Sequence, residues 1–431
     1  MRQQNGDAPK TSTGLSSVVD GLQRLGPGLV TGAADDDPSG IATYSMAGAQ
    51  FGNALSWTMV VTLPLMIAVQ LASARVGRVT GKGLAKSLGV VMPGWLLVIL
   101  VGLLFVANTI NIGADLAAMG EATALVLGGH KHIFTFVVAS VSLLLQLFVP
   151  YRTYASYLKW LTLVLLAYVA LLFMVHVDWE NVARGLVVPT VSGKGAMTTI
   201  VAIFGTTISP YLFFWQAAQE VEELKQVDER EPLVRAKSQA SDALNRIWWD
   251  TVAGMVVSNL VALAIIFGAA VTLHVSGKTE IDSAADAARA LRPIAGNFAF
   301  LIFALGIIGT GMLAVPVLAG SSAYAVCEVG GWIASLEHQP TRAKGFYAVI
   351  ALGVLLGIGI DWSPLNPMKA LFWSAVLNGI VAVPVLVGLM IVVARRDIMK
   401  DFVASKLLRT LGWLATAVMA AAAIAMFVLP N

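Results

Sequence analysis

The chain has 431 residues, of which 57% are apolar and 12% charged, and its mean hydropathy is +0.78. Soluble domains are about 45–50% apolar and about 25% charged, so the composition excludes an ordinary soluble protein and indicates an all-α polytopic membrane protein. The net charge of +3 gives no support to nucleic-acid binding, because the positions of Lys and Arg in a membrane protein mainly reflect its orientation in the membrane. The single cysteine, Cys327, excludes an internal disulfide and a cysteine-based metal site.

Eleven apolar segments follow a polar start. Residues 1–25 have no apolar core of their own, which predicts a short cytoplasmic tail and not a cleavable signal peptide. A membrane-spanning helix needs about 20 apolar residues. Segments near this length recur along the rest of the chain, at 26–52, 55–76, 94–114, 133–149, 155–176, 196–219, 247–273, 294–322, 345–360, 370–394 and 407–429.

The basic residues favour one orientation of these segments. With the N-terminus in the cytoplasm, about three quarters of the 28 Lys and Arg residues fall in cytoplasmic connections. The positive-inside rule therefore predicts a multi-pass protein of the cell membrane with a cytoplasmic N-terminus and an external C-terminus.

Two of the segments are interrupted. The sequence DDDPSG (35–40) breaks the first segment, and TTISP (206–210) breaks the sixth. Proline removes a backbone donor, and irregular backbone at membrane depth is tolerated only where it lines an enclosed cavity. Breaks five helices apart predict a LeuT-like pair of inverted five-helix repeats, 26–176 and 196–394, followed by an eleventh helix within 407–431.

The three carboxylates of the first break predict a cation site. An intramembrane carboxylate costs roughly 2.5–3.5 kcal/mol at a helix centre, so Asp35, Asp36 and Asp37 together require a cation, protons or water. One alternative is a solvated surface loop that does not cross the membrane. Another is that one aspartate is a ligand, while the others cap the next half-helix or face a vestibule.

The second break offers further oxygen ligands. These are the side chains of Thr206 and Ser209, the carbonyl groups that Pro210 frees, and the Gln216 side chain farther along. Gln216 and Glu220 are four residues apart and share one face if the helix continues. This set of ligands contains only oxygen.

Other polar residues are candidates for the permeation or coupling pathway. Asn111 and Asp115 form a polar stripe on the third segment, and Asp115 alternatively makes a helix–helix hydrogen bond. Asn378 on the tenth segment either completes the site or serves packing. Glu220, with two further glutamates, forms either an acidic funnel toward the cytoplasm or an ordinary solvated helix end.

Four stretches of the sequence resemble the Nramp family of metal-ion transporters. GPGLVTGAADDDPSGIATY (26–44) resembles the family's first-helix signature of Gly-Pro-Gly, Asp-Pro-Gly-Asn and an Ala-Thr pair. GADLAAMGEA (113–122) is similar to its third helix, and GTTISPYLFFWQAAQ (205–219) to its sixth. AYAVCEVGG (323–331) is similar to a late Glu-Gly element. The resemblance covers most of the chain and implies an eleven-helix transporter.

The departures from the family pattern bear on selectivity. Asp37 matches the family's metal-binding aspartate, but the asparagine that accompanies it falls on Gly40. The family's sixth-helix methionine, a soft ligand, falls on Ser209. The two histidines that the family links to proton movement fall on Tyr211 and Gln216.

These exchanges imply a change of substrate. An all-oxygen site suits a hard divalent cation, Mg²⁺ or Mn²⁺, better than a soft transition metal, as in the Nramp-related magnesium transporters, to which the chain is similar. Without the histidines, weak or absent proton coupling is expected, although the third-helix aspartate is retained as Asp115. The cation is a substrate, no cofactor is expected, the bilayer is the other partner, and the oligomeric state is open.

Other function classes fit the same scaffold. The main alternative is a transporter of an anion or amino acid that moves with Na⁺ or H⁺, because half-helix N-termini can bind anions while carboxylates hold a coupling cation. A receptor that binds cations without transporting them is a further alternative. No nucleophile and base pair is recognisable, so an enzyme is not expected.

Overall fold

The computed structural model describes residues 31–32, 34–150, 153, 163–174, 178–190, 193–226, 229–364 and 366–429. The expected cytoplasmic tail (1–25) and the Gly-Pro-Gly motif lie outside the described residues. The expected first and fifth segments are described only in part, as α3 (Pro38–Phe51) and α9 (Leu166–Met174).

The described part of the chain is helical and contains no strand. Within it, nine helical stretches are long and apolar enough to cross a membrane. They contain α4 (Trp57–Thr80), α6 (Gly94–Leu127), α7 (Lys131–Phe148), the pair α11 (Gly193–Thr207) and α12 (Pro210–Gln226), α13 (Ala240–Ala269), α16 (Ala299–Gly330), α17 (Lys344–Asp361), α18 (Pro367–Ala394) and α20 (Lys406–Val428).

Short helices connect the long ones. A π-helical turn, η3 (Ala270–His274), extends α13. Besides α9 and several 3-10 turns, the short helices are α5 (Leu84–Leu88), α10 (Trp179–Val187), α14 (Ala284–Ala288), α15 (Arg292–Ala295) and α19 (Arg396–Met399).

The third apolar segment is longer than expected. The sequence places its end at 114, just before the first acidic residue, but α6 continues to Leu127. Asp115 does not end the helix, because it is buried against neighbouring helices and not solvated. The helix stops at Gly128, whose φ of 72° suits glycine far better than other residues.

Both expected helix breaks are present. The helical stretch that contains residues 34 and 35 ends before Asp36, and the next helix, α3, begins at Pro38. In the sixth segment α11 ends at Thr207 and α12 begins at Pro210. Proline suits both starts, because the first helical residue needs no donor for an intrahelical bond.

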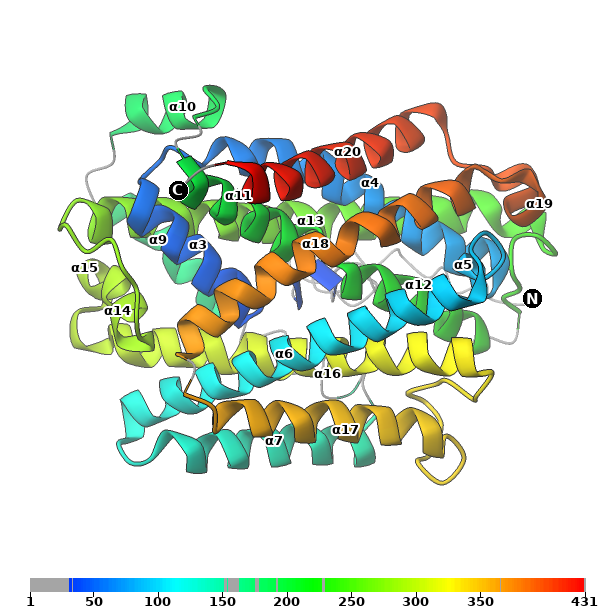
Figure 1. Ribbon diagram of the computed structural model, residues 1–431, viewed down its shortest axis with the longest axis horizontal. Coiled ribbons are helices and arrows are strands. Elements are labelled where there is room, and N and C mark those ends of the chain that lie inside the picture. Colours follow the sequence, from blue (N-terminus) through cyan, green and yellow to red (C-terminus); the bar gives the residue numbers. More distant parts are fainter. Residues whose placement is uncertain are drawn as a thin grey trace, which may run out of the picture.

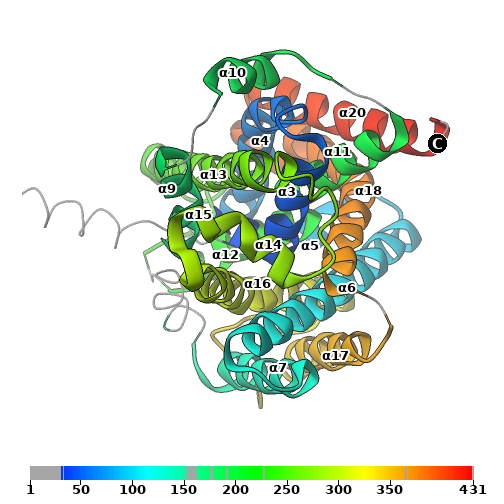
Figure 2. The same ribbon diagram turned by 90° about the vertical axis from the view of Figure 1, so that its left-hand side faces the viewer.

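The first break is inside the protein. Asp35, Asp36 and Asp37 are 0%, 4% and 0% exposed, so the alternative of a solvated surface loop is wrong. Figure 1 shows α3, α11, α12 and α18 in the middle of the molecule, between a layer of α4 and α20 and a layer of α6, α16, α7 and α17. Seen along the helices, α3 is surrounded by neighbours (Figure 2).

Close helix contacts hold the broken segments in place. The helical residues before the first break, 31–32 and 34–35, are called the leading half-helix. This half-helix meets α13 where Gly32 lies against Gly254, and a Cβ atom on Gly32 would be 2.5 Å from the Gly254 carbonyl oxygen. Similarly, a Cβ atom on Gly205 of α11 would be 1.9 Å from the Ala375 carbonyl oxygen of α18. Side chains are excluded at these crossings, so the half-helices approach their neighbours backbone to backbone.

Candidate functional site

Asp37 is the central side chain of the first break. Its Oδ1 atom accepts hydrogen bonds from the Ser39 hydroxyl (2.6 Å) and the Gly40 amide (2.7 Å), so it caps the N-terminus of α3. Its Oδ2 atom accepts from Asn111 Nδ2 (3.2 Å) and the Tyr211 hydroxyl (3.3 Å). One carboxylate therefore joins α3, α6 and α12.

The second break lies next to the first. A Cβ atom on Gly40 would be 3.2 Å from Thr206 Oγ1, so the start of α3 lies against the end of α11. The Tyr211 hydroxyl is also 3.3 Å from the Ala34 carbonyl oxygen of the leading half-helix, so its single hydrogen is shared between this oxygen and Asp37. Ser209 is buried, and its hydroxyl donates to the Gly205 (2.6 Å) and Thr206 (2.8 Å) carbonyl oxygens of its own helix.

Asp35 and Asp36 are directed to a different helix. The Ser258 hydroxyl of α13 lies 2.7 Å from Asp35 Oδ2 and 3.2 Å from Asp36 Oδ1. A hydroxyl has one hydrogen, so it satisfies one carboxylate at a time. Asp35 Oδ1 is buried without a hydrogen-bond partner in the described part of the chain.

Helices α6 and α18 complete the wall around Asp37. Asn111 Oδ1 accepts from the Ser374 hydroxyl (3.0 Å), so Asn111 links Asp37 to α18. Asp115 lies one turn after Asn111 and is fully buried, and neither of its carboxylate oxygens has a hydrogen-bond partner among the described residues. The same holds for both amide atoms of Asn378, one turn after Ser374.

Gln216 and Glu220 lie farther along α12. Gln216 Oε1 accepts from the Thr31 hydroxyl (2.6 Å), which ties α12 to the leading half-helix. Glu220 is fully buried and its Oε2 atom is 2.8 Å from Arg246 Nη2, which also pairs with Glu223 (2.7 Å). Of the two alternatives for this stretch, the solvated helix end is therefore wrong for Glu220, which is buried and ion-paired.

The charge balance of the first break is unusual. In the described residues no Lys or Arg forms an ion pair with Asp35, Asp36 or Asp37. A buried carboxylate is normally paired, protonated or bound to a metal. These three carboxylates therefore need protons or a cation from outside the protein to balance their charge.

Two contacting residues were missed by the sequence reasoning. Ser258 comes from α13 and Ser374 from α18, and both lie within long apolar helices. The four-residue spacing of Ser374 and Asn378 was a usable signal, because it puts both side chains on one helix face. Ser258 had no such partner, and only the packing of α13 against the first break reveals it.

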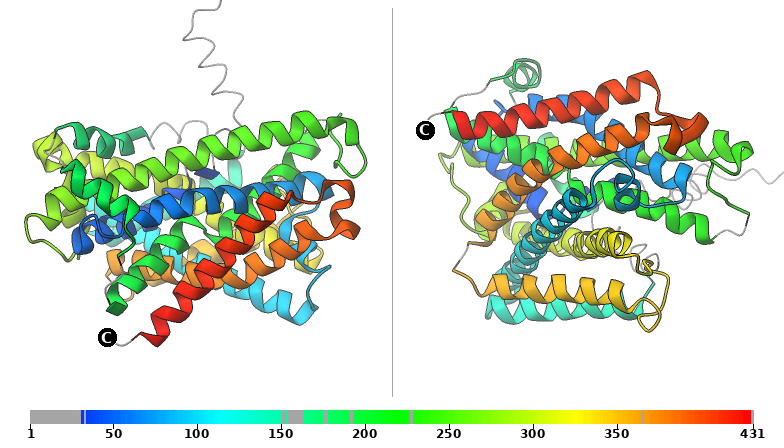
Figure 3. Two further views of the ribbon diagram at one scale, coloured as in Figure 1. Left: turned by 90° about the horizontal axis from the view of Figure 1, so that it is seen from above. Right: turned by 45° about the vertical axis from the view of Figure 1, so that its right-hand side comes forward.

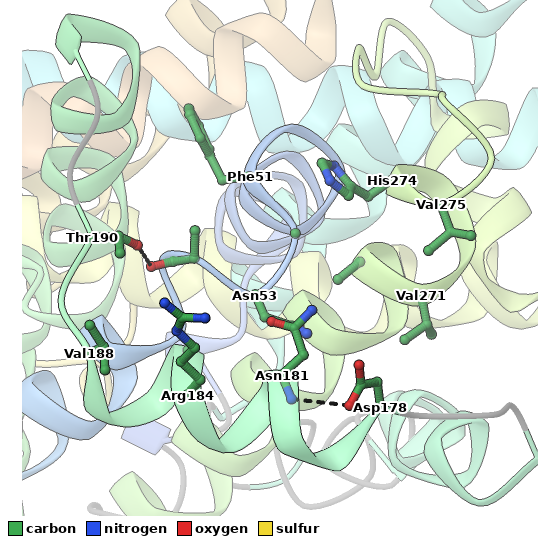
Figure 4. Close-up of a pocket in the computed structure, with 14 residues that line it drawn as sticks. Phe51, Asn53, Asp178, Asn181, Arg184, Val188, Thr190, Val271, His274 and Val275 are labelled. Carbon is green, nitrogen blue, oxygen red and sulfur yellow. Dashed lines mark hydrogen bonds between the residues drawn. The ribbon is translucent and has the colours of Figure 1, made fainter.

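A separate cavity of about 450 Å³ lies at the far end of α3 (Figure 4). It is lined by Phe51, Asn53, residues of α10 and His274 of η3, whose Nδ1 is 2.8 Å from the Ala49 carbonyl oxygen. Thr190 donates to the Ala54 carbonyl oxygen (2.8 Å) at its edge. Asp37 is fourteen residues, or about 21 Å of helix, away, so this cavity is not part of the site at the breaks.

Comparison with known proteins gives a consistent result. A family model described as natural resistance-associated macrophage protein-like (Nramp) matches residues 28–429. The divalent metal cation transporter MntH of Klebsiella pneumoniae is 27% identical over 416 residues, which are 92% of each chain. A protein of the same name from Caldanaerobacter subterraneus is 23% identical over 409 residues, covering 91% of this chain and 89% of the relative.

Solved structures share the fold. A crystal structure of the Eremococcus coleocola manganese transporter superposes with a TM-score of 0.74 at 16% identity, covering 96% of this chain and 88% of the other. MhsT in complex with L-phenylalanine superposes with a TM-score of 0.58 at 14% identity, covering 94% and 98%. The fold is therefore LeuT-like, with helices broken in the first and sixth segments.

Proposed function

The chain belongs to the Nramp family, and from this premise we propose that it transports a hard divalent cation, Mg²⁺ or Mn²⁺, by alternating access around an all-oxygen site where the two helix breaks meet. Members of this family are transporters and not enzymes, and they move a divalent metal as substrate without a cofactor. The observation that carries the proposal is the group of three buried aspartates without a basic partner in the described residues.

The donor atoms support a hard cation. Asp37, Thr206, Ser209 and Tyr211 offer oxygen atoms, and none offers sulfur. Carboxylate, carbonyl and water ligands suit Mg²⁺ and Mn²⁺, whereas thioether ligands favour softer ions. In this assignment Asp37 is the principal anionic ligand, and Ser209 contributes through the carbonyl groups near Pro210.

Asp35 and Asp36 act in this proposal as a second layer of negative charge. They approach Ser258 on α13 and not the side chains around Asp37. Mg²⁺ gives up its water reluctantly and usually retains several water molecules. A hydrated ion at Asp37 is stabilised by nearby carboxylates even when they do not touch it, because the surroundings are of low dielectric constant.

Asp115, Glu220 and Asn378 are assigned to the pathway. Gln216, which the sequence placed among the metal ligands, is moved to the pathway because its Oε1 atom accepts from the Thr31 hydroxyl. Among the described residues, the polar atoms of the Asp115 and Asn378 side chains have no hydrogen-bond partner, and they lie in the buried region next to Asn111 and Ser374. With Tyr211 and Gln216 at the family's histidine positions, we propose transport with weak or no proton coupling. The repeats 26–176 and 196–394 would move against each other, with the N-terminus in the cytoplasm and the C-terminus outside the cell membrane.

The test is uptake by purified protein in liposomes. Mg²⁺, Mn²⁺ and Cd²⁺ are supplied separately, with and without an inward proton gradient. We expect Mg²⁺ or Mn²⁺ uptake that changes less than about twofold with the gradient, and little Cd²⁺ uptake. Ser209→Met should increase Cd²⁺ uptake relative to Mg²⁺, because it supplies a soft sulfur ligand.

Two outcomes of this experiment would contradict the proposal. Uptake of neither Mg²⁺ nor Mn²⁺, together with uptake of an amino acid or anion, would favour a different solute on the same scaffold. Cd²⁺ uptake by the unmodified protein that matches its Mn²⁺ uptake would contradict the hard-cation selectivity.

A further inference from the structure

The short helix α5 packs against the helices that surround Asp37. It contacts α6, α12, α16 and α18, and the right view of Figure 3 shows the light-blue α5 next to the orange α18 and the green α12. Helices α6 and α12 carry the side chains that bind Asp37, and α18 carries the serine that holds Asn111. Four of the five residues of α5 are buried, namely Leu84, Ala85, Ser87 and Leu88.

The contact with α18 places α5 near one surface of the membrane. Leu88 lies against Gly388, where a Cβ atom would be 2.5 Å from Leu88 Cδ2. Gly388 follows Asn378 by ten residues, or about 15 Å of helix, and half of the hydrocarbon core is about 15 Å thick. The nearby Lys82 and Lys86 assign this surface to the cytoplasm. Helix α5 therefore lies between the site and the cytoplasm.

The N-terminus of α5 is capped from another helix. Its N-cap residue is Gly83, which has no side chain to serve as a cap. Instead Glu328 of α16 accepts a hydrogen bond at Oε2 from the Lys86 amide (3.0 Å), and the Ala85 amide also donates to this carboxylate. These are the two amides that an N-cap side chain normally binds. A Cβ atom on Gly83 would be 1.6 Å from Glu328 Oε1, so glycine leaves the room that the carboxylate needs.

The position of α5 depends on this cap. Isolated helices shorter than about 12–15 residues are marginal in water, and α5 has five residues. A carboxylate that binds backbone amides forms charge-assisted hydrogen bonds, which are stronger than neutral ones. Because Glu328 belongs to α16 and α5 follows α4, the bond also joins the two expected repeats on the cytoplasmic side.

We propose that Glu328 is a positioning residue that holds α5 (residues 84–88) in place as a cytoplasmic plug of the transport pathway. Helix α5 stays bound to Glu328 while the cation enters from outside, and it is released when the cation passes to the cytoplasm. Asp37 is fully buried, so this passage requires the surrounding elements to move. The plug role rests on the proposed transport function, whereas the bond between Glu328 and α5 does not.

The test is thiol labelling of Ser87→Cys in a Cys327→Ala background, which contains no other cysteine. Ser87 is 1% exposed, so a water-soluble maleimide should label the new thiol slowly while α5 is in place. Glu328→Ala should raise the labelling rate about tenfold or more, because a hydrogen bond to a charged group contributes roughly tenfold to an equilibrium. Gly83→Ala should act similarly, because it fills the space of the carboxylate. Glu328→Gln keeps an acceptor oxygen and should raise the rate less.

Control variants separate release of α5 from loss of the fold. Glu337→Ala removes an exposed carboxylate from the segment after α16 and should leave the labelling rate unchanged. Ser142→Cys on α7 replaces another buried serine, and its labelling should stay slow when Glu328→Ala is added.

A second measurement separates a moving plug from a static cap. Mn²⁺ and Mg²⁺ are titrated by calorimetry, and the labelling of Ser87→Cys is repeated with a saturating concentration of the ion that binds. The rate should change at least about threefold, because a transported ion shifts the population between the states of the cycle. A cap with a purely structural role would not produce this change.

Three outcomes would overturn the proposal. The first is labelling of Ser87→Cys at the original rate in both Glu328→Ala and Gly83→Ala. The second is equal acceleration of Ser87→Cys and Ser142→Cys, which would show loss of the fold and not release of α5. The third is a labelling rate that does not respond to a cation that the protein binds. The substitutions are compared without a cation, so a lack of Mg²⁺ and Mn²⁺ binding would contradict the proposed function and not the bond between Glu328 and α5.

Discussion

Asp37→Asn is expected to abolish uptake of the transported divalent cation. The exchange keeps the size of the side chain and an oxygen that can cap α3, because Asn caps helices as well as Asp does. It removes the negative charge that faces Asn111 and Tyr211. Loss of groups that only support a metal ligand lowers affinity about 10–100-fold, so loss of a direct anionic ligand should lower uptake by more than about 100-fold.

The matched control is Asp242→Asn, in the exposed first turn of α13. It removes one carboxylate charge without touching the breaks and should transport like the unmodified protein. Both variants should have similar melting temperatures in detergent. If Asp37→Asn folds and still transports within about threefold of the unmodified protein, Asp37 is not the principal ligand.

Arg246→Gln is expected to destabilise the protein strongly. Glu220 is fully buried and loses its ion-pair partner, while 23% of the Arg246 side chain is exposed. Breaking a buried ion pair by removing one partner typically costs about 3–5 kcal/mol, and the partial exposure of Arg246 places the expected loss near the lower end. The double variant Arg246→Gln/Glu220→Gln should recover part of this loss, because the fully buried charge of Glu220 is removed and Glu223 keeps Arg230 as a partner.

The melting temperature in detergent measures this effect, with Arg230→Gln as the comparison. Arg230 pairs with Glu223, and both side chains are more exposed, at 37% and 15%. Exposed pairs contribute about 0–1 kcal/mol, so this variant should melt close to the unmodified protein. If Arg246→Gln has the same melting temperature as Arg230→Gln, the ion pair between Glu220 and Arg246 does not contribute to the stability of the protein.

The sequence predicted those parts of the site that depend on local pattern. Pro38 and Pro210 mark the breaks, because proline cannot continue an intrahelical hydrogen-bond ladder. The aspartates next to Pro38 were recognisable because carboxylates in an apolar segment are costly. The family resemblance identified Asp37 among the three, and the structure gives it different partners from those of Asp35 and Asp36.

The partners from other helices could not be predicted. Ser258 meets Asp35 across 223 positions of sequence, and Ser374 meets Asn111 across 263. These contacts depend on how α13 and α18 cross the broken helices, which no local periodicity specifies. The sequence left Glu220 either in an acidic funnel or at a solvated helix end for the same reason, because its ion pair with Arg246 of α13 depends on the packing of two helices.

The position of the bound cation is the most direct measurement of the central claim. Crystals of the protein grown with Mn²⁺ can be examined by anomalous diffraction, which identifies the metal by its own scattering. We predict one strong peak between the two breaks, with Asp37 and the carbonyl oxygens near Ser209 as its nearest protein atoms, either directly or through one water. A peak elsewhere in the membrane region, or no peak at a saturating Mn²⁺ concentration, would contradict the proposed site.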